Sequence, residues 1–351
     1  MNLLGIDTSC DDTSASVLMD GCRVLSSVVH SQIKLHHPYG GVVPELASRE
    51  HLGKIVSVVN EALAEAKISI QNLNGIAVTV GPGLIGSLLV GLYFAKALAY
   101  VQEIPLVGVN HLEGHILSIF LEDDMPPFPL VVLTVSGGHT CLFHVEDFGR
   151  YTLLGQTLDD AAGEAFDKVA KILGLGYPGG VVIENLARSG DKHSIPFPRA
   201  HLGPGSLDFS FSGLKTAVAL YVKKWRGSRA ERDRLQMADI AASFQEAVID
   251  VLVQKLMQAQ ETTGVGVVVI AGGVACNTEL RKRVKETALQ KGVAVYYPRP
   301  AYCTDNGAMI ALAGYHRIMH GERADLSIDV RSRYPVEDLA PLTKLDTKES
   351  I

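Results

Sequence analysis

The stretch "DDMPPFPLVVLTVSGGHTCLFHV", residues 123–145, decides the fold because it restarts a pattern that the chain has already passed through once. A proline-rich hinge leads into an apolar run, a double-glycine turn and a second apolar run, which is typical of a buried strand with a hairpin partner. Residues 2–31 have the same form, and in both halves segments with helix and strand spacing then alternate. The sequence therefore predicts an α/β fold of two duplicated lobes with a ligand cleft between them.

We place the N-terminal lobe at residues 1–129 and the C-terminal lobe at residues 130–324. The segment from about 325 to 351 is expected to pack back on the first lobe. The chain has 351 residues, 47% of them hydrophobic, which exceeds the usual size of one domain and supports this division.

The charge balance limits the class of partner. With 32 basic and 38 acidic residues the formal net charge is -6, which argues against a free-standing nucleic-acid binder. The acidic balance does not exclude a local basic patch, or a partner that supplies one. The five cysteines are an odd number without a CxxC pair, so we expect free thiols in a reducing cytosol and a cytoplasmic protein.

One segment raises the question of a membrane span, because residues 68–95 contain no charged side chain. The sequence "GPG" at 81–83 interrupts it, between a strand-like and a helix-like run. This favours a buried strand, turn and helix over a membrane segment. The N-terminus also lacks the basic start and apolar run of a secretory signal, so we expect no membrane association.

Three glycine-rich or polar turns follow apolar runs. They are "DTSCDDTSASV" from residue 7, "TVSGGHT" from 134 and "IAGGVACN" from 270. Glycine lets the backbone approach a ligand closely, and hydroxyl and N–H groups in such turns can hold phosphate oxygens. Each turn alone is equally consistent with an ordinary β-turn. Together the three favour a nucleotide in the cleft.

The stretch "HLEGH" contains two candidate metal ligands. His111 and His115 are four residues apart and so leave a helix on the same side. With Asp305 as a third ligand they make a two-histidine, one-carboxylate set that suits Fe(II) or Zn(II). A lone pair of this kind is more often structural. A zinc-protease helix is excluded, because HExxH needs a glutamate directly after the first histidine, whereas Glu113 points about 200° away from His111.

Ten motifs along the chain resemble those of one family, the TsaD (Gcp) tRNA N6-adenosine threonylcarbamoyltransferases. They are "GIDTSCDDT", "KLHHPYGGVVPELASREH", "GPGLIGSLLVG", "HLEGH", "VSGGHT", "LDDAAGEAFDKVAK", "GYPGG", "DFSFSGLKT", "AGGVACN" and "CTDNGAM". They occur in order from residue 3 to about 334. The resemblance implies an actin/sugar-kinase/Hsp70-like (ASKHA) fold. It also implies transfer of a threonylcarbamoyl group from threonylcarbamoyl-adenylate to the N6 amine of the adenosine 3′ of the anticodon, in tRNAs reading codons that begin with A.

The resemblance also implies a set of site residues. One iron or zinc ion would be held by His111, His115 and Asp305. The adenylate would contact Thr134, Val135, Ser136, Gly137, Gly138, Asp167, Gly180, Glu184 and Asn277. No general base is assigned. This chain departs from the family where Asp7 and Asp12 replace the usual glutamates, which shortens their reach. Thr134 stands where archaeal relatives have a tyrosine ligand, so no phenolate ligand is expected.

The family works with a TsaB-like paralogue and a TsaE-like ATPase, which implies that tRNA binds across an assembly. The most basic stretches are residues 223–234 and 281–285, each of which is equally consistent with a solvated helix face. The cleft and the glycine-rich turns alone also fit two other classes, an ASKHA-type ATPase or sugar kinase and a non-catalytic scaffold of the paralogue type. The histidine pair with Asp305 argues against both, because kinases of this fold hold Mg²⁺ on carboxylates and the scaffold lacks metal ligands.

Overall fold

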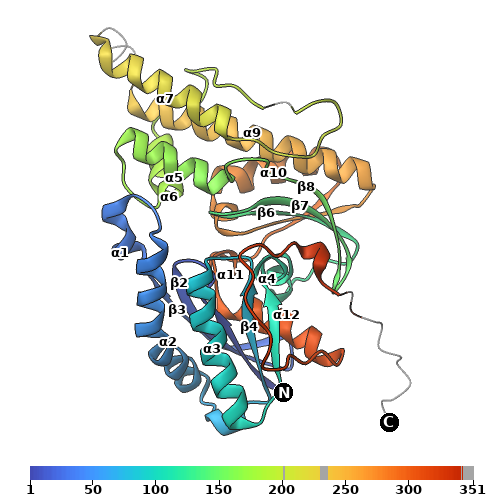
Figure 1. The fold of residues 1–351 in the computed structure, drawn as a ribbon. Coiled ribbons are helices and arrows are strands. Elements are labelled where there is room, and N and C mark those ends of the chain that lie inside the picture. The colour runs from blue at the N-terminus through green and yellow to red at the C-terminus, as the bar shows by residue number, and fades with distance from the viewer. Residues whose placement is uncertain (201, 230–235, 341, 343–351) are drawn as a thin grey trace.

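The chain is described by a computed structural model covering residues 1–200, 202–229, 236–340 and 342. Two five-stranded mixed sheets lie one in each lobe (Figure 1). The first sheet has the order β3-β2-β1-β4-β5. Its strands are β1 (Asn2–Asp7), β2 (Asp12–Met19), β3 (Arg23–Ser31), β4 (Gly75–Gly81) and β5 (Leu106–Asn110). β1 and β3 each pair antiparallel with β2. β4 and β5 extend the sheet on the other side of β1 and run parallel to it.

The second sheet repeats this arrangement strand for strand. In the order β8-β7-β6-β9-β10 it consists of β6 (Leu130–Val135), β7 (Thr140–Asp147), β8 (Arg150–Gln156), β9 (Val267–Ala271) and β10 (Ala294–Tyr296). β6, β7 and β8 are antiparallel, and β9 and β10 run parallel to β6. The duplication predicted from residues 123–145 is therefore present in the strand topology.

The first lobe carries its helices on the crossovers between strands. They are α1 (Ile33–His36), η1 (His37–Tyr39), α2 (Pro44–Ala66), η2 (Ile70–Asn72), α3 (Ile85–Gln102), α4 (His111–Leu117) and η3 (Ser118–Leu121). α2 packs against α3, β2 and β3, and α3 packs against β4. α2 begins at Pro44, since proline is well accommodated in the first turn of a helix.

The apolar segment is less buried than we expected. β4 is fully buried, but only 33% of α3 is buried inside the structure. By length and composition α3 is apolar enough to cross a membrane, although core helices of soluble proteins pass the same test. Tyr93, Tyr100 and Val101 are all more than half exposed on it.

The second lobe adds α5 (Ala162–Leu173), α6 (Gly179–Ala187), α7 (Ser212–Gly227), α9 (Met237–Thr263), η4 (Gly273–Cys276), α10 (Thr278–Gln290) and α11 (Pro300–Cys303). The many Gly and Pro residues between 176 and 212 predict an irregular stretch there, and α6 within it is a correction. Ile183 and Ala187 of α6 are buried, and the helix packs between α5 and α9. Tertiary burial therefore orders a segment whose glycines and prolines favour loops.

The chain returns to the first lobe with α12 (Gly307–Met319), which packs against β1, β2, β4, β5 and α4. Gly5 and Gly307 make this approach possible. A Cβ atom on Gly5 would lie 2.1 Å from the carbonyl oxygen of Gly307. We expected the return only at about residue 325, and we propose instead that it begins with α12. The boundaries 1–129 and 130–324 otherwise stay predictions.

The segment after α12 continues along the first lobe. The Arg331 N–H donates to the Val80 carbonyl at 2.8 Å, and the Asn110 side chain donates to the Tyr334 carbonyl at 2.8 Å. A last turn, η5 (Val336–Asp338), contacts β8 of the second lobe. Of the expected returning segment, residues 341 and 343–351 lie outside the described part of the chain.

Candidate functional site

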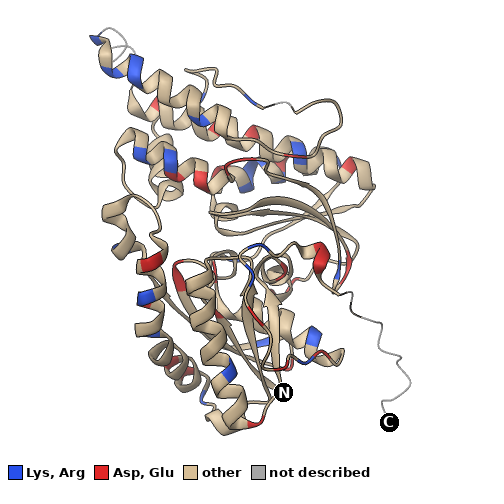
Figure 2. Cartoon of the chain, in the orientation of Figure 1, with Lys and Arg blue, Asp and Glu red and all other residues tan. Residues whose placement is uncertain are grey.

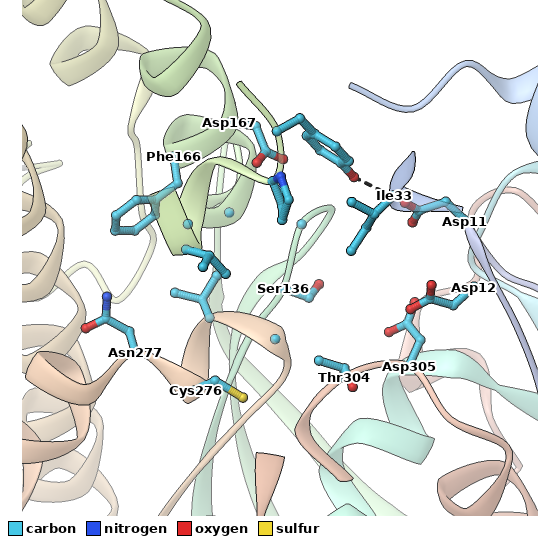
Figure 3. Close-up of a pocket in the computed structure, with 18 of the residues that line it drawn as sticks. Asp11, Asp12, Ile33, Ser136, Phe166, Asp167, Cys276, Asn277, Thr304 and Asp305 are labelled. Atoms are coloured by element: carbon cyan, nitrogen blue, oxygen red, sulfur yellow. Dashed lines mark hydrogen bonds between the residues drawn. The ribbon is translucent and has the colours of Figure 1, made fainter. Parts of the chain in front are cut away.

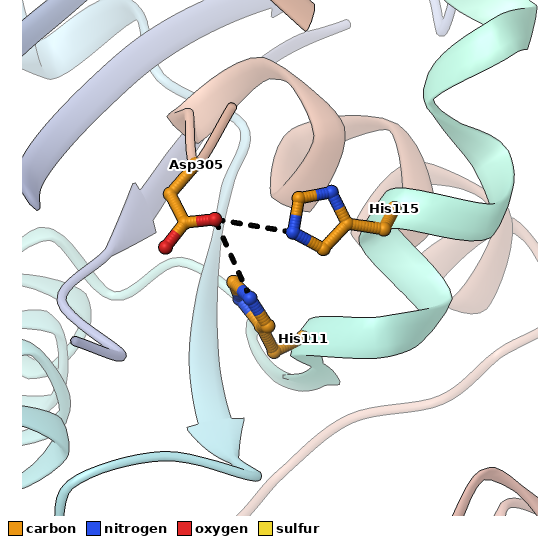
Figure 4. Close-up of side chains that lie close together, drawn as sticks. All are labelled: His111, His115 and Asp305. Atoms are coloured by element: carbon orange, nitrogen blue, oxygen red, sulfur yellow. Dashed lines mark hydrogen bonds and ion pairs between the residues drawn. The ribbon is translucent and has the colours of Figure 1, made fainter. Parts of the chain in front are cut away.

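The histidine pair and Asp305 meet at the start of α4 (Figure 4). Asn110 caps this helix, because its side-chain oxygen accepts from the N–H groups of Leu112 and Glu113 at 2.9 and 3.4 Å. Asp305 Oδ1 lies 3.1 Å from His115 Nε2 and 3.6 Å from His111 Nε2. The ligand atoms of the three residues all lie within 4.8 Å of one another, so the set can hold a metal ion.

The electrostatics around the pair fit a cation. Burial by itself would lower the pKa of His111, but the carboxylates of Asp305 and Asp7 outweigh it and raise the pKa to about 9. Burial opposes ionisation of Asp305, and the two histidines nevertheless hold its pKa below the usual range. The buried Nδ1 atom of His115 has no hydrogen-bond partner among the described residues. A metal ion bound here would take over from the imidazole protons the role of a positive charge beside the carboxylates.

Glu113 lies on the other side of α4, as the spacing predicted. Its carboxylate accepts two hydrogen bonds from Arg317, from Nε at 2.7 Å and from Nη2 at 2.8 Å. The Tyr151 hydroxyl donates to the same carboxylate at 3.0 Å. Glu113 is thus fully engaged away from the histidine pair, which agrees with the exclusion of an HExxH mechanism.

A cavity of about 320 Å³ opens beside Asp305 between the two lobes (Figure 3). Its lining contains seven residues that we assigned to the site: Ser136, Gly137, Asp167, Gly180, Glu184, Asn277 and Asp305. Of the residues predicted to contact the adenylate, three do not line it among the described residues. Thr134 and Val135 are buried in β6, and Gly138 is exposed in the following turn.

The loop Ser136–Gly137 is held against the start of α5. A Cβ atom on Gly163 would lie 2.5 Å from the Ser136 carbonyl oxygen and 2.8 Å from the Gly137 Cα. The Ser136 hydroxyl accepts from the His139 N–H at 3.2 Å, which closes the turn. The glycine-rich turn thus forms one wall of the cavity with its backbone.

The carboxylate of Asp167 faces the cavity from α5. Burial raises its pKa to about 6, although the Gly179 N–H donates to it at 2.7 Å and so favours the charged form. This hydrogen bond also fixes the start of α6 and places Gly180 at the cavity wall.

Glu184 of α6 and Asn277, the N-cap residue of α10, both bind the start of α10 with their side chains. Glu184 accepts from the Thr278 N–H at 3.0 Å. Asn277 accepts from the Leu280 N–H at 3.0 Å and donates to Gln245 at 2.8 Å. Both side chains already have protein partners, so their first role here is to fix this helix end against the cavity.

The cavity also contains residues that we did not assign to the site. They are Asp11, Asp12, Ser31, Ile33, Gly163, Phe166, Tyr177, Pro178, Val181, Gly273, Val274, Cys276 and Thr304. Tyr177 of the second lobe donates to Asp11 of the first at 3.1 Å, so this bond bridges the cleft. Asp12 has its pKa raised to about 7 by burial and by the Asp305 charge. The polar turn from residue 7 and the "GYPGG" motif were the available signals for Asp11 and Tyr177.

The chain matches the family model "TsaD: tRNA N6-adenosine threonylcarbamoyltransferase" over residues 23–312. The chain belongs to the TsaD family. A relative from Desulfitobacterium hafniense, named tRNA N6-adenosine threonylcarbamoyltransferase, is 56% identical over 329 residues, which cover 94% of this chain and 96% of the relative. One from Geobacter metallireducens with the same name is 53% identical, covering 97% and 98%. The predicted family and the predicted transferase class are confirmed.

Solved structures share the fold at low identity. Component A of the (R)-2-hydroxyglutaryl-CoA dehydratase from Acidaminococcus fermentans matches with a TM-score of 0.54 at 17% identity, covering 91% of this chain and 99% of that one. Full-length HypF, in a phosphate- and nucleotide-bound form, matches at 0.59 and 13%, covering 90% and 55%. With the duplicated sheets, these matches confirm the predicted two-lobed ASKHA fold of this TsaD family member.

Proposed function

We propose that this chain transfers the threonylcarbamoyl group of threonylcarbamoyl-adenylate to the N6 amine of the adenosine 3′ of the anticodon, in tRNAs reading codons that begin with A. The observation that carries this proposal is the position of Asp305. It belongs both to the histidine cluster and to the lining of the interlobe cavity. A metal ion on this cluster would border the site for the adenylate. Family membership supports the transfer itself.

The reaction requires one bond exchange. The N6 nitrogen attacks the carbamoyl carbonyl carbon, the bond from that carbon to the phosphate oxygen breaks, AMP leaves, and the amine loses one proton. The target base must be accessible to the cavity, as for other enzymes that act on a base. We assign no side chain to accept the proton.

His111, His115 and Asp305 would hold one Fe(II) or Zn(II) ion, since two imidazoles and one carboxylate suit either metal. When bound, the ion supplies Lewis-acid chemistry to oxygens of the mixed anhydride. The Ser136–Gly137 backbone, Gly180 and Asn277 would hold the adenylate, and Asp167 would accept from one of its hydroxyl groups. Glu184 would act by fixing α10. Thr134 and Val135 stay part of the proposed site as the strand end that leads into the Ser136–Gly137 turn, and Gly138 stays part of it as a residue of that turn.

We further propose that the chain acts in the cytoplasm with tRNA, a TsaB-like paralogue and a TsaE-like ATPase. Figure 2 shows Lys and Arg spread over both lobes and interspersed with Asp and Glu. The basic stretch 281–285 is partly neutralised, since Arg283 pairs with Glu246 at 2.6 Å and Asp250 at 3.0 Å. Residues 230–234 of the other stretch lie outside the described part of the chain. These features support a tRNA site that partners complete.

A partner would also cover apolar side chains on the first lobe. Leu52 and Val56 of α2 are 70% and 56% exposed, and Tyr93 and Tyr100 of α3 are 61% and 72% exposed. Exposed apolar side chains gathered on neighbouring helices are typical of protein–protein contacts.

The experiment that tests the function is complementation. A strain depleted of its own transferase receives the parent chain or the His111→Ala variant, and tRNA nucleosides are measured by mass spectrometry. We expect threonylcarbamoyladenosine with the parent and none with the variant, each expressed at equal level. Absence of the nucleoside with the parent, in a strain that supplies the partners, would refute the proposal.

A further inference from the structure

Glu113 and Arg317 form an ion pair inside the first lobe, away from the cavity. The side chains of Arg317 and Glu113 are 2% and 1% exposed. The two N–H···O bonds, at 2.7 and 2.8 Å, join the guanidinium fork to both carboxylate oxygens. A pair of this kind fixes direction as well as distance. Because removing two charges from water is costly, the pair is a poor device for stability alone.

The pair connects the two elements that carry the proposed metal ligands. Glu113 lies between His111 and His115 on α4, and Arg317 lies in the last turn of α12, whose start follows Asp305. Gly307 and Arg317 are about 15 Å apart along the helix axis. α4 therefore has one contact just before the start of α12, at Asp305, and another in its last turn, at Arg317.

A third contact lies between these two. A Cβ atom on Gly114 would be 3.0 Å from Ile310 Cδ1 and 3.1 Å from Met309 Cγ, so α4 lies directly on the first turn of α12. An apolar contact of this type resists separation but not sliding or rotation. The ion pair at one end supplies the directional restraint that the apolar contact lacks.

The second lobe is attached at the same point. Tyr151 of β8 donates to Glu113 Oε1 at 3.0 Å. Phe148, in the turn before β8, stacks on His316 of α12 with ring centroids 3.7 Å apart and planes at 16°. The β7–β8 hairpin thus contacts both α4 and α12 behind the metal ligands.

We propose that Glu113 and Arg317 are positioning residues that fix α4 against α12 and so set the separation of the two histidines from Asp305, with Tyr151 joining this pair to the second lobe. The proposal rests on the metal site described under the proposed function. It assigns to Glu113 neither a metal bond nor a proton transfer. Its role is to hold His111 and His115 where a single ion can reach both and Asp305.

The test compares metal affinity with stability in Glu113→Gln and Arg317→Lys. Zinc dissociation constants are measured by competition with a chromophoric chelator, and the melting temperature is measured on metal-free protein. We expect zinc affinity to fall by about tenfold or more, as when groups that orient metal ligands are removed. The matched control is Glu322→Gln, since Glu322 pairs with Arg317 Nη1 at 2.8 Å on the partly exposed side. Its affinity should stay within about twofold, as for an exposed pair.

The double variant Glu113→Leu/Arg317→Met separates positioning from stability. Apolar residues of similar size often replace a buried pair without loss of stability. We expect a melting temperature near that of the parent with zinc affinity still about tenfold weaker. This variant also provides the measurement if Glu113→Gln does not fold. Recovery of both properties, or parent affinity in a folded Glu113→Gln, would overturn the inference.

A parallel Asp305→Asn variant distinguishes failure of the positioning role from failure of the metal site. If zinc binding by the parent depends on Asp305 but not on Glu113, only the positioning role fails. If it does not depend on Asp305 either, the proposed metal site fails and this inference fails with it.

Discussion

Asp305 Oδ1 lies 3.1 Å from His115 Nε2, although the two residues are 190 positions apart in the chain. The intervening segment contains the second lobe. α12 then returns to the first sheet and brings Asp305 to the start of α4. The same return places Asp305 at the interlobe cavity, so the fold itself joins the metal ligands to the proposed adenylate site.

Replacing His115 by alanine should abolish stoichiometric binding of Fe(II) or Zn(II) by the purified protein. His115 is fully buried and supplies the closest nitrogen to Asp305, so its loss leaves only His111 and Asp305 of the proposed ligand set. Metal content after dialysis is measured by elemental analysis. The control is His30→Ala, since His30 lies in β3 and pairs with Glu50 away from the cluster. Equal metal content in His115→Ala and the parent would exclude this ligand set.

Binding of the adenylate should weaken as pH falls through about 6, where Asp167 becomes protonated. Burial raises this pKa, so the carboxylate is ionised above pH 6, where it is the stronger acceptor for a ligand hydroxyl. Affinity for a non-reactive adenylate analogue should fall by up to about tenfold per pH unit below that value. Calorimetry between pH 5 and 8 measures it.

The comparison variant for this pH effect is Asp167→Asn, which should bind less tightly at pH 8 and lose the Asp167 part of the pH dependence. Asp12 titrates near the same pH in the same cavity, so the difference between the two proteins is the relevant quantity. Identical pH profiles in parent and variant would remove Asp167 from the binding site.

Gly5→Ala should destabilise the first lobe. The added Cβ would lie 2.1 Å from the Gly307 carbonyl oxygen and 2.6 Å from the Ala311 nitrogen, both backbone atoms that cannot move aside cheaply. We expect a loss of about 1–3 kcal/mol or more in the free energy of unfolding. Urea denaturation measures it.

Gly53→Ala is the matched control for Gly5→Ala, since Gly53 lies inside α2 with nothing within 4 Å of the new Cβ. It should instead stabilise by about 0.5–1 kcal/mol. A neutral Gly5→Ala variant would mean that β1 and α12 do not approach as described.

Tyr177→Phe should weaken adenylate binding by removing the hydrogen bond to Asp11 that bridges the cleft. One hydrogen bond contributes about 0.5–1.5 kcal/mol, so we expect a change of roughly twofold to tenfold in the dissociation constant. Tyr93→Phe, on the exposed face of α3, is the control and should bind as the parent does. Unchanged affinity in Tyr177→Phe would show that this bridge does not hold the ligand in place.

Local patterns were sufficient for the strands and turns. Apolar runs followed by Gly137 or Gly272 predicted the duplicated sheets, because strand periodicity and glycine turns are local properties. The spacing of His111 and His115 likewise predicted one helical face. Local patterns did not predict contacts between segments that are distant in the sequence. Residue type made Asp305 a candidate third ligand and the family resemblance implied it, but neither showed its contact with the histidines, and the Tyr177–Asp11 bridge was missed.

Tertiary packing also changed three predictions about helices. α6 forms where glycine and proline favour a loop, because Ile183 is buried between α5 and α9. α3 is less buried than its composition indicates, and Tyr100 remains exposed on it. α12 joins the first lobe earlier than the sequence placed it, since Gly307 lets it approach β1 closely. For α6 and α12 a deciding partner, α9 or β1, lies far away in the sequence.

The most direct test of the central claim is a transfer assay with metal added back. The purified chain, stripped of metal by a chelator and supplied with TsaB-like and TsaE-like partners, receives threonylcarbamoyl-adenylate and unmodified tRNA. Threonylcarbamoyladenosine is then measured by mass spectrometry. We predict no product until Fe(II) or Zn(II) is restored, and none at any metal concentration for Asp305→Asn. Full product from the stripped parent, or from Asp305→Asn, would contradict the account.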